Sequence, residues 1–148
     1  MNSELHPRGF TLLEILLVIS LIAALAAISV PVNQGWQQKN DLDIAVNTFV
    51  QNSRRAQTLA QGMASDTSWG VLVATSTLVL FQGASYAARA SSTDEITDFG
   101  SDISVSGAAE IVFAKFTGFP AAATTTTLSI SADETHTITI NRRGAINY

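Results

Sequence analysis

The stretch Arg8-Gly9-Phe10-Thr11-Leu12-Leu13-Glu14 opens an apolar run that continues to Val32. Glu14 is the only charged residue between Phe10 and Val32. At about 1.5 Å of rise per residue, a helix over residues 10–32 is roughly 35 Å long, enough to cross a hydrocarbon core of about 30 Å. A carboxylate inside such a run costs about 3 kcal/mol unless it has a partner, so Glu14 is a candidate functional residue. The alternative is an ordinary membrane anchor that tolerates one Glu. It does not explain why Glu14 lies four residues after Phe10 in the segment Arg8-Gly9-Phe10.

At these residues the sequence resembles the type IV prepilins and the pseudopilins of type II secretion. Their signature is a short polar leader ending in Gly, followed by Phe, Thr, Leu and a Glu at mature position five. The resemblance implies that a prepilin peptidase/methyltransferase cuts after Gly9 and that Phe10 becomes N-methylphenylalanine. It also implies that Glu14 acts in assembly by pairing with the amine of a neighbouring subunit. Pro31 falls where many pilins have a proline, and it should kink or loosen the helix because it removes a backbone hydrogen bond.

The leader, residues 1–9, is too short and polar to fold. An ordinary secretory signal is the alternative, with cleavage in the small residues Ala23–Ala27, but it leaves Gly9 and Glu14 unexplained. Arg8 favours a cytoplasmic N-terminus, although Glu4 opposes it. The expected protein is therefore a single-pass protein of the cytoplasmic membrane whose C-terminal domain is exported.

Composition limits what the rest of the chain does. The 148 residues suit one compact domain plus an anchor. A net charge of −4 argues against binding nucleic acid through overall charge, though not against a local basic patch. The chain has no cysteine, so disulfides cannot hold an exported domain together. Many pilins close their C-terminal region with a disulfide, and this chain departs from that pattern.

Residues 33–62 are predicted to continue the helix as an amphipathic segment. Apolar or small residues recur there at spacings of three and four, which predicts a stripe that packs on a sheet. The stripe consists of Leu42, Val46, Phe49, Ser53, Ala56 and Ala60. Gly62 fits a helix stop.

Residues 63–148 are predicted to form a globular β domain. Residues 69–74 and 77–82 read as a hairpin joined by Thr75-Ser76. Residues 83–107 read as a surface loop with a short strand at 103–105. Its acidic residues are expected to be solvated, because their spacing does not match a calcium loop. These are Asp94, Glu95, Asp98 and Asp102.

Further strands are predicted after this loop. They cover residues 111–117, 127–131, 137–141 and 145–148, with turns at 118–120, 132–136 and 142–144. This half resembles the H-type pseudopilin and related minor pilins. The resemblance rests on a strand with Phe, Gly and Pro over residues 111–120, and on a strand followed by Arg and Gly near the C-terminus. The predicted fold class is therefore α+β, a long N-terminal helix packed on an antiparallel β domain, as in pilins.

No catalytic constellation is present, and we predict neither an enzyme, a cofactor nor a metal site. His6 and His136 lie on either side of the apolar segment, and His136 is expected to be solvated in a turn. The predicted function is a minor pilin or pseudopilin that assembles with other pilins into a type IV pilus or a type II secretion pseudopilus. The alternative is a minor pilin that binds DNA for uptake through Arg142 and Arg143. A single-pass membrane enzyme is a third hypothesis, and no site supports it.

Overall fold

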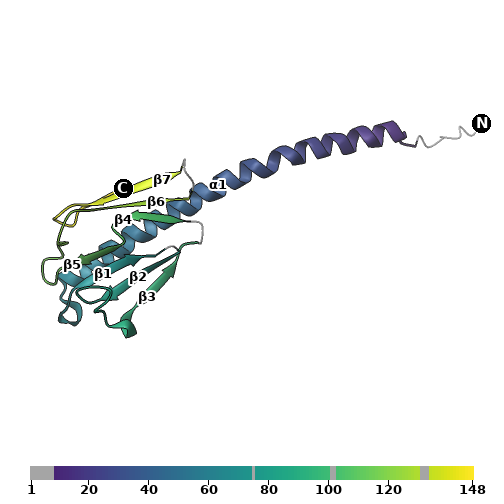
Figure 1. The fold of residues 1–148 in the computed structure, drawn as a ribbon. Coiled ribbons are helices and arrows are strands. Elements are labelled where there is room, and N and C mark those ends of the chain that lie inside the picture. The colour runs from purple at the N-terminus through teal and green to yellow at the C-terminus, as the bar shows by residue number, and fades with distance from the viewer. Residues whose placement is uncertain (1–8, 75, 101–102, 131–133) are drawn as a thin grey trace, which may run out of the picture. The chain divides into compact units, whose positions relative to one another are not determined.

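The computed structural model describes residues 9–74, 76–100, 103–130 and 134–148, with the side chains of residues 27–35 outside the description. The chain divides into two compact units, Met1–Gln37 and Gln38–Tyr148. One helix, α1 (Leu12–Gln61), contributes to both units, and all of the strands belong to the second (Figure 1). The predicted division into domains, with boundaries at residues 32 and 62, stays a prediction.

The first unit contains the start of α1. From Leu12 to Leu25 every large apolar side chain is between 49% and 79% exposed. Where the structure describes the chain, no helix combines the length and the apolarity that a membrane crossing needs. The predicted membrane span over residues 10–32 includes side chains outside the description and stays a prediction. The same holds for the kink at Pro31, which lies among residues 27–35.

In the second unit, α1 buries the predicted stripe. All six stripe residues are buried, and Ala45 and Val50 widen the buried face. The helix ends at Gln61, and the Gly62 N–H donates to the Thr58 carbonyl oxygen at 2.9 Å. The helical spacing and the Gly62 stop are therefore confirmed.

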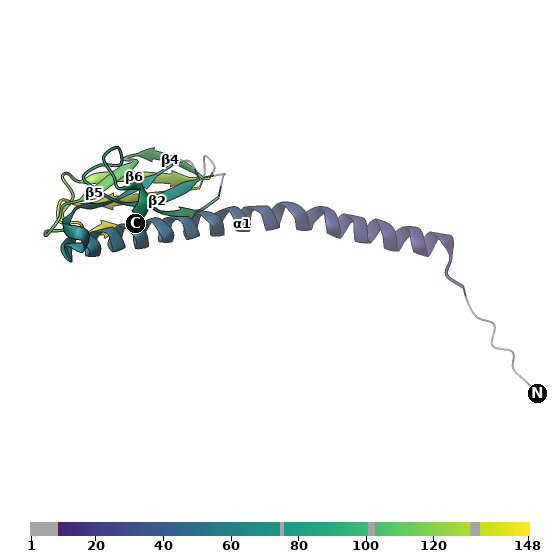
Figure 2. The same cartoon turned by 90° about the horizontal axis from the view of Figure 1, so that it is seen from below.

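The strands form two antiparallel four-stranded sheets. The first sheet has the order β3 (Glu95–Asp98), β2 (Thr77–Gln82), β1 (Trp69–Val73), β5 (Glu110–Phe113). The second has the order β4 (Ser104–Gly107), β6 (Thr124–Ser129), β7 (Thr135–Ile140), β8 (Ile146–Asn147). The strands lie mostly along one side of the C-terminal part of α1 (Figure 2). The predicted α+β class is confirmed.

One hydrophobic core joins the helix to both sheets. Phe49 of α1, Phe113 of β5 and Ile138 of β7 are each at most 1% exposed and belong to the same cluster. Full burial of a side chain of this size contributes about 2 kcal/mol relative to exposure. The second unit therefore has a core of its own, which fits the absence of disulfides.

The hairpin of β1 and β2 is confirmed, with Trp69 paired to Gln82 and Val73 to Leu78.

Tyr86 and Arg89 cover part of the face of this sheet that points away from α1. The Tyr86 ring meets Phe81 edge-on at 5.6 Å between centroids, and the Arg89 guanidinium stacks 3.6 Å from the centre of the Tyr86 ring.

The segment predicted as a surface loop is more ordered than expected. It contains β3, whose backbone pairs with β2 although its Glu-Ile-Thr-Asp sequence is mostly polar. The expectation of solvated acids is wrong for Asp94, which accepts from Arg89 Nε at 2.7 Å and raises the pKa of that guanidinium. Glu95 is exposed as expected, and its carboxylate also binds both terminal nitrogens of Arg55 at 2.6 and 2.7 Å. Asp98 is exposed, and Asp102 lies outside the described residues.

Two later predictions need correction. The strand predicted over 111–117 ends at Phe113, because the chain turns and Phe116 adopts a left-handed φ of 77°. His136 is not in a turn. It lies in β7, half-buried, with Nε2 3.4 Å from Asp43 Oδ1. The meander itself is confirmed, since β6 pairs with β7 and β7 with β8.

Candidate functional site

The junction of the predicted leader with the helix lies in non-helical, accessible backbone. Gly9, Phe10 and Thr11 precede α1, and Phe10 is 78% exposed. A Cβ added at Gly9 would meet nothing within 4 Å. The Gly9–Phe10 peptide bond therefore lies in accessible backbone outside the helix.

Thr11 caps the helix, and the sequence analysis missed this role. Its Oγ1 accepts a hydrogen bond from the Glu14 N–H at 3.3 Å, and its carbonyl oxygen accepts from the N–H groups of Glu14 and Ile15 at 3.1 and 3.3 Å. These are N–H groups that the first turn of a helix would otherwise leave without partners. The signal was available, because Thr followed three residues later by Glu is the capping-box pattern.

Glu14 lies in the first turn of α1, where the helix dipole favours a negative charge. Over residues 9–26, no hydrogen bond or ion pair joins its carboxylate to another side chain. Glu14 and Phe10 line one shallow hollow together with Ile15, Val18 and Ile19. The structure therefore brings together two of the residues predicted to act in processing and assembly.

After Glu14 the surface of α1 is apolar up to Ala26, apart from one hydroxyl group that bonds within the helix. Ser20, the one hydroxyl between Thr11 and Ala26, donates its Oγ–H to the Leu17 carbonyl oxygen at 2.8 Å. In an apolar medium an unsatisfied hydroxyl would be costly, and this bond removes that cost.

Arg142 and Arg143 lie in the tight turn between β7 and β8, as predicted. The Asn141 side-chain oxygen accepts from the N–H groups of Arg143 and Ala145 at 2.9 and 3.0 Å, which fixes the turn. Both arginines are exposed, and neither takes part in an ion pair within the described chain. They belong to the second unit, whereas Gly9 and Glu14 belong to the first.

The described residues contain no group of three or more His, Asp or Glu side chains able to hold a metal ion. The junction combines an accessible peptide bond between Gly9 and Phe10 with a nearby carboxylate, that of Glu14. Together with one long helix and antiparallel sheets among the described residues, this arrangement is consistent with the pilin fold.

Comparison with known proteins agrees with this class. The family model for the prokaryotic N-terminal methylation motif matches residues 6–30, so the chain carries a prepilin-type N-terminus. Over 43 residues the chain is 46% identical to the Prepilin peptidase-dependent protein D of Escherichia coli (strain K12). That stretch covers 29% of this chain and spans only 30% of the length of the relative. No solved structure matches the chain. The predicted resemblance to prepilins and pseudopilins is therefore confirmed at the N-terminus.

Proposed function

We propose that this chain is a structural subunit, a minor pilin or pseudopilin, which is processed at Gly9 and assembled with other pilins into a type IV pilus or a secretion pseudopilus. The observation that carries the proposal is the methylation motif at residues 6–30, which coincides with an exposed apolar helix start holding one carboxylate. The similarity to a prepilin peptidase-dependent protein supports the same processing step.

Processing would consist of two reactions at one place. Hydrolysis of the Gly9–Phe10 amide adds one water and yields a carboxylate on Gly9 and an amine on Phe10. A methyl donor then transfers a methyl group to that amine, which loses a proton in exchange. An α-amine with a pKa of about 8 is largely protonated at neutral pH. The mature chain would then begin with a positive charge close to the Glu14 carboxylate.

This charge gives Glu14 a partner. An unpaired carboxylate in an apolar environment is costly, and leaving one member of a buried ion pair alone costs about 3–5 kcal/mol. We infer that Glu14 of one subunit pairs with the Phe10 amine of its neighbour. A subunit inserted out of register would leave both charges unpaired, so the pair would select the correct register.

The same surface supports membrane insertion before assembly. Large apolar side chains at least 49% exposed over Leu12–Leu25 need a covering that water does not provide. The proposed covering is first the lipid of the cytoplasmic membrane and later neighbouring helices. The N-terminus would stay on the cytoplasmic side, and the unit Gln38–Tyr148 would be exported.

The Glu14→Gln variant tests the assembly role. It keeps the size and the cap position but removes the charge, so we expect normal cleavage and membrane insertion with little incorporation into sheared filaments. Glu134→Gln, the same change in the second unit, serves as the matched control and should incorporate normally. Glu14→Gln incorporation equal to the control would refute the pairing mechanism.

The alternative function is DNA binding during uptake. The exposure of Arg142 and Arg143 in a fixed turn supports it, and the net charge of −4 opposes it. A gel shift with the full chain that disappears in Arg142→Ala/Arg143→Ala would support this alternative. The absence of any shift at moderate salt would remove it.

A further inference from the structure

An exposed aromatic ring projects from the end of the second unit where α1 stops. Phe116, in the turn between β5 and the bridge residue Pro120, is 72% exposed. Its backbone holds a left-handed φ of 77°, a conformation that costs a bulky residue about 1–3 kcal/mol. The loop therefore keeps an unfavourable conformation while it leaves a large apolar side chain in water.

The loop is held rigidly against the end of the helix. The Phe116 N–H donates to the Ala60 carbonyl oxygen at 2.9 Å, and Lys115 Nζ lies 2.9 Å from Asp66 Oδ1. The Gln57 and Gln61 side-chain amides donate to the carbonyl oxygens of Gly118 and Thr117 at 3.2 and 3.4 Å. A ring presented by a fixed loop loses little conformational entropy on binding, and aromatic residues of this kind commonly dominate interfaces.

The basic turn lies beside this loop. A Cβ on Gly144 would sit 3.1 Å from the Gly118 carbonyl oxygen, so the turn that carries Arg142 and Arg143 packs against the Phe116 loop. We call Phe116, Arg142 and Arg143 the basic aromatic tip. All three are exposed.

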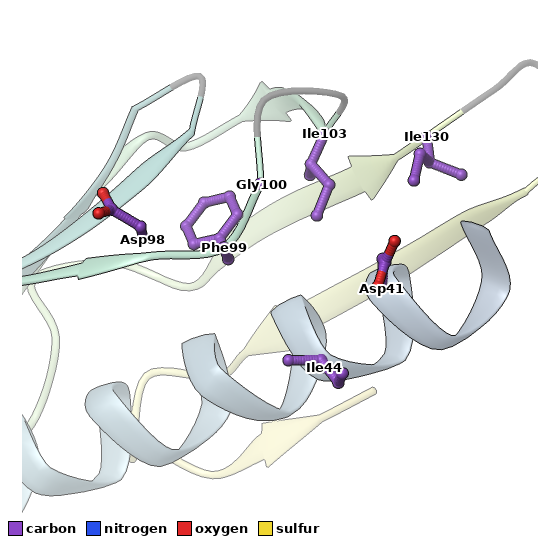
Figure 3. A pocket seen from close by; sticks show the side chains of 7 residues that line it. All are labelled: Asp41, Ile44, Asp98, Phe99, Gly100, Ile103 and Ile130. Carbon is purple, nitrogen blue, oxygen red and sulfur yellow. The ribbon is translucent and has the colours of Figure 1, made fainter. Parts of the chain in front are cut away.

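A hollow of complementary character lies elsewhere on the same unit (Figure 3). It has a cavity volume of about 350 Å³, and its apolar lining comes from α1, from the β3–β4 connection and from the end of β6. The apolar lining residues are Ile44, Phe99, Ile103 and Ile130. Asp41 and Asp98 add two exposed carboxylates, and neither belongs to an ion pair within the described chain.

We propose that the basic aromatic tip of one copy of this chain docks in the acidic hollow of a second copy. Phe116 would enter between Ile44 and Phe99, while Arg142 and Arg143 would face Asp41 and Asp98. The inference rests on the proposed function, because it names the contact that assembled copies make through their globular units.

The occupant is a second copy because the two surfaces match in both charge and polarity. Two unpaired arginines lie in the turn that packs against the loop of an exposed ring, and two unpaired aspartates line a hollow of about 350 Å³ with an apolar wall. One copy cannot join its own two surfaces, because Ile44 and Ala60 are about 24 Å apart along α1. A contact between different surfaces of identical copies is head-to-tail and continues into a filament unless it closes into a ring.

The absence of cysteine permits a direct test in the full chain within its own membranes. Thr117→Cys marks the loop of the tip, and Asn40→Cys marks the exposed position of α1 next to Asp41. Both substitutions spare the residues that make the proposed contact. Each variant is expressed alone and then together with the other, and a short bis-maleimide crosslinker is added. We expect a crosslinked dimer only in the mixture, because the contact is head-to-tail.

Second substitutions in the mixed pair test the chemistry. Phe116→Ala should lower the dimer yield about tenfold, whereas Tyr148→Ala, which removes another exposed ring of the same unit, should leave it unchanged. Arg142→Glu/Arg143→Glu should abolish the dimer through like-charge contact. Asp41→Arg/Asp98→Arg in the Asn40→Cys copy should then restore the dimer. A variant that had lost the dimer through misfolding would not be rescued in this way.

The sheared-filament fraction of the same cells separates this inference from the proposed function. A chain present in filaments without a mixed dimer would overturn the docking inference and leave the structural function intact. Dimers of the Thr117→Cys variant with itself, or crosslinks only to other host proteins, would also overturn it. A chain absent from filaments would refute the proposed function and the docking with it.

Discussion

The two units of this chain differ in how their apolar side chains are covered. In the first unit, the large apolar residues from Leu12 to Leu25 are exposed. They lie within the methylation motif, which spans residues 6–30. In the second unit, α1 and two sheets close over a common core that includes Phe49 and Ile138. The first unit carries the matched motif and leaves its apolar side chains uncovered, whereas the second has a hydrophobic core of its own.

This difference suggests a division of labour. In the proposed function, processing and insertion would use the accessible junction and the apolar helix of the first unit, without the β domain. Docking between copies requires fixed surfaces, which only a packed unit provides. A substitution in one unit that changes the behaviour of the other would contradict this division.

The largest expected effect is that of Phe49→Ala. Phe49 is 1% exposed at the centre of the core, so its truncation should lower the free energy of unfolding of the second unit by about 3–5 kcal/mol. Thermal denaturation of the full chain in detergent, followed by near-ultraviolet circular dichroism, measures this. Ile44→Ala, on the same helix but 52% exposed, is the matched control and should change stability by less than about 1 kcal/mol. Cleavage at Gly9 should be normal in both, and its loss in Phe49→Ala would show that the units are not independent.

A smaller effect is expected for the helix cap. Thr11→Val keeps the shape of the side chain but removes the oxygen that accepts from the Glu14 N–H, so it should cost about 1 kcal/mol at the first turn. Hydrogen exchange at the Glu14 amide should be about fivefold faster. Thr11→Ser, which retains the oxygen, should behave as the unsubstituted chain. Equal exchange in Thr11→Val and Thr11→Ser would contradict the cap.

The smallest effect is expected at Ser53. Its Oγ is buried without a hydrogen-bond partner among the described residues, so Ser53→Ala should raise the free energy of unfolding by about 0.5–1 kcal/mol. Thr58→Ala, on the same helix, removes a hydroxyl that does donate, to the Arg54 carbonyl oxygen at 2.9 Å, and should not stabilise. A loss of stability in Ser53→Ala would mean that this hydroxyl has a partner.

The buried face of the helix was predictable from the sequence, because a helix that packs on a sheet needs apolar residues at spacings of three and four. The spacing of Leu42, Phe49 and Ala56 places these residues on one helix face, and the structure buries that face. The hairpin of β1 and β2 was predictable for the same reason, since its strands are nearly continuous apolar runs. In both cases side-chain chemistry determines the local structure.

The missed features depend on the backbone or on distant partners. Strand β3 is polar, and it forms because its backbone completes the ladder beside β2. Phe116 turns left-handed because its N–H reaches the Ala60 carbonyl oxygen, a contact with no local sequence signal. The hollow near Ile44 combines three separate segments of the chain, so only the fold reveals it. In the candidate site, Gly9, Phe10 and Glu14 fall within the matched methylation motif because their order forms part of a recognisable pattern, and their roles stay predictions.

The central claim is that this chain is a processed subunit, and the intact mass and N-terminal peptide of the membrane-extracted protein from its own host test it most directly. We predict a chain that begins at Phe10 and is heavier by one methyl group. A chain that begins at Met1, or one that begins after Ala23–Ala27, would contradict the account.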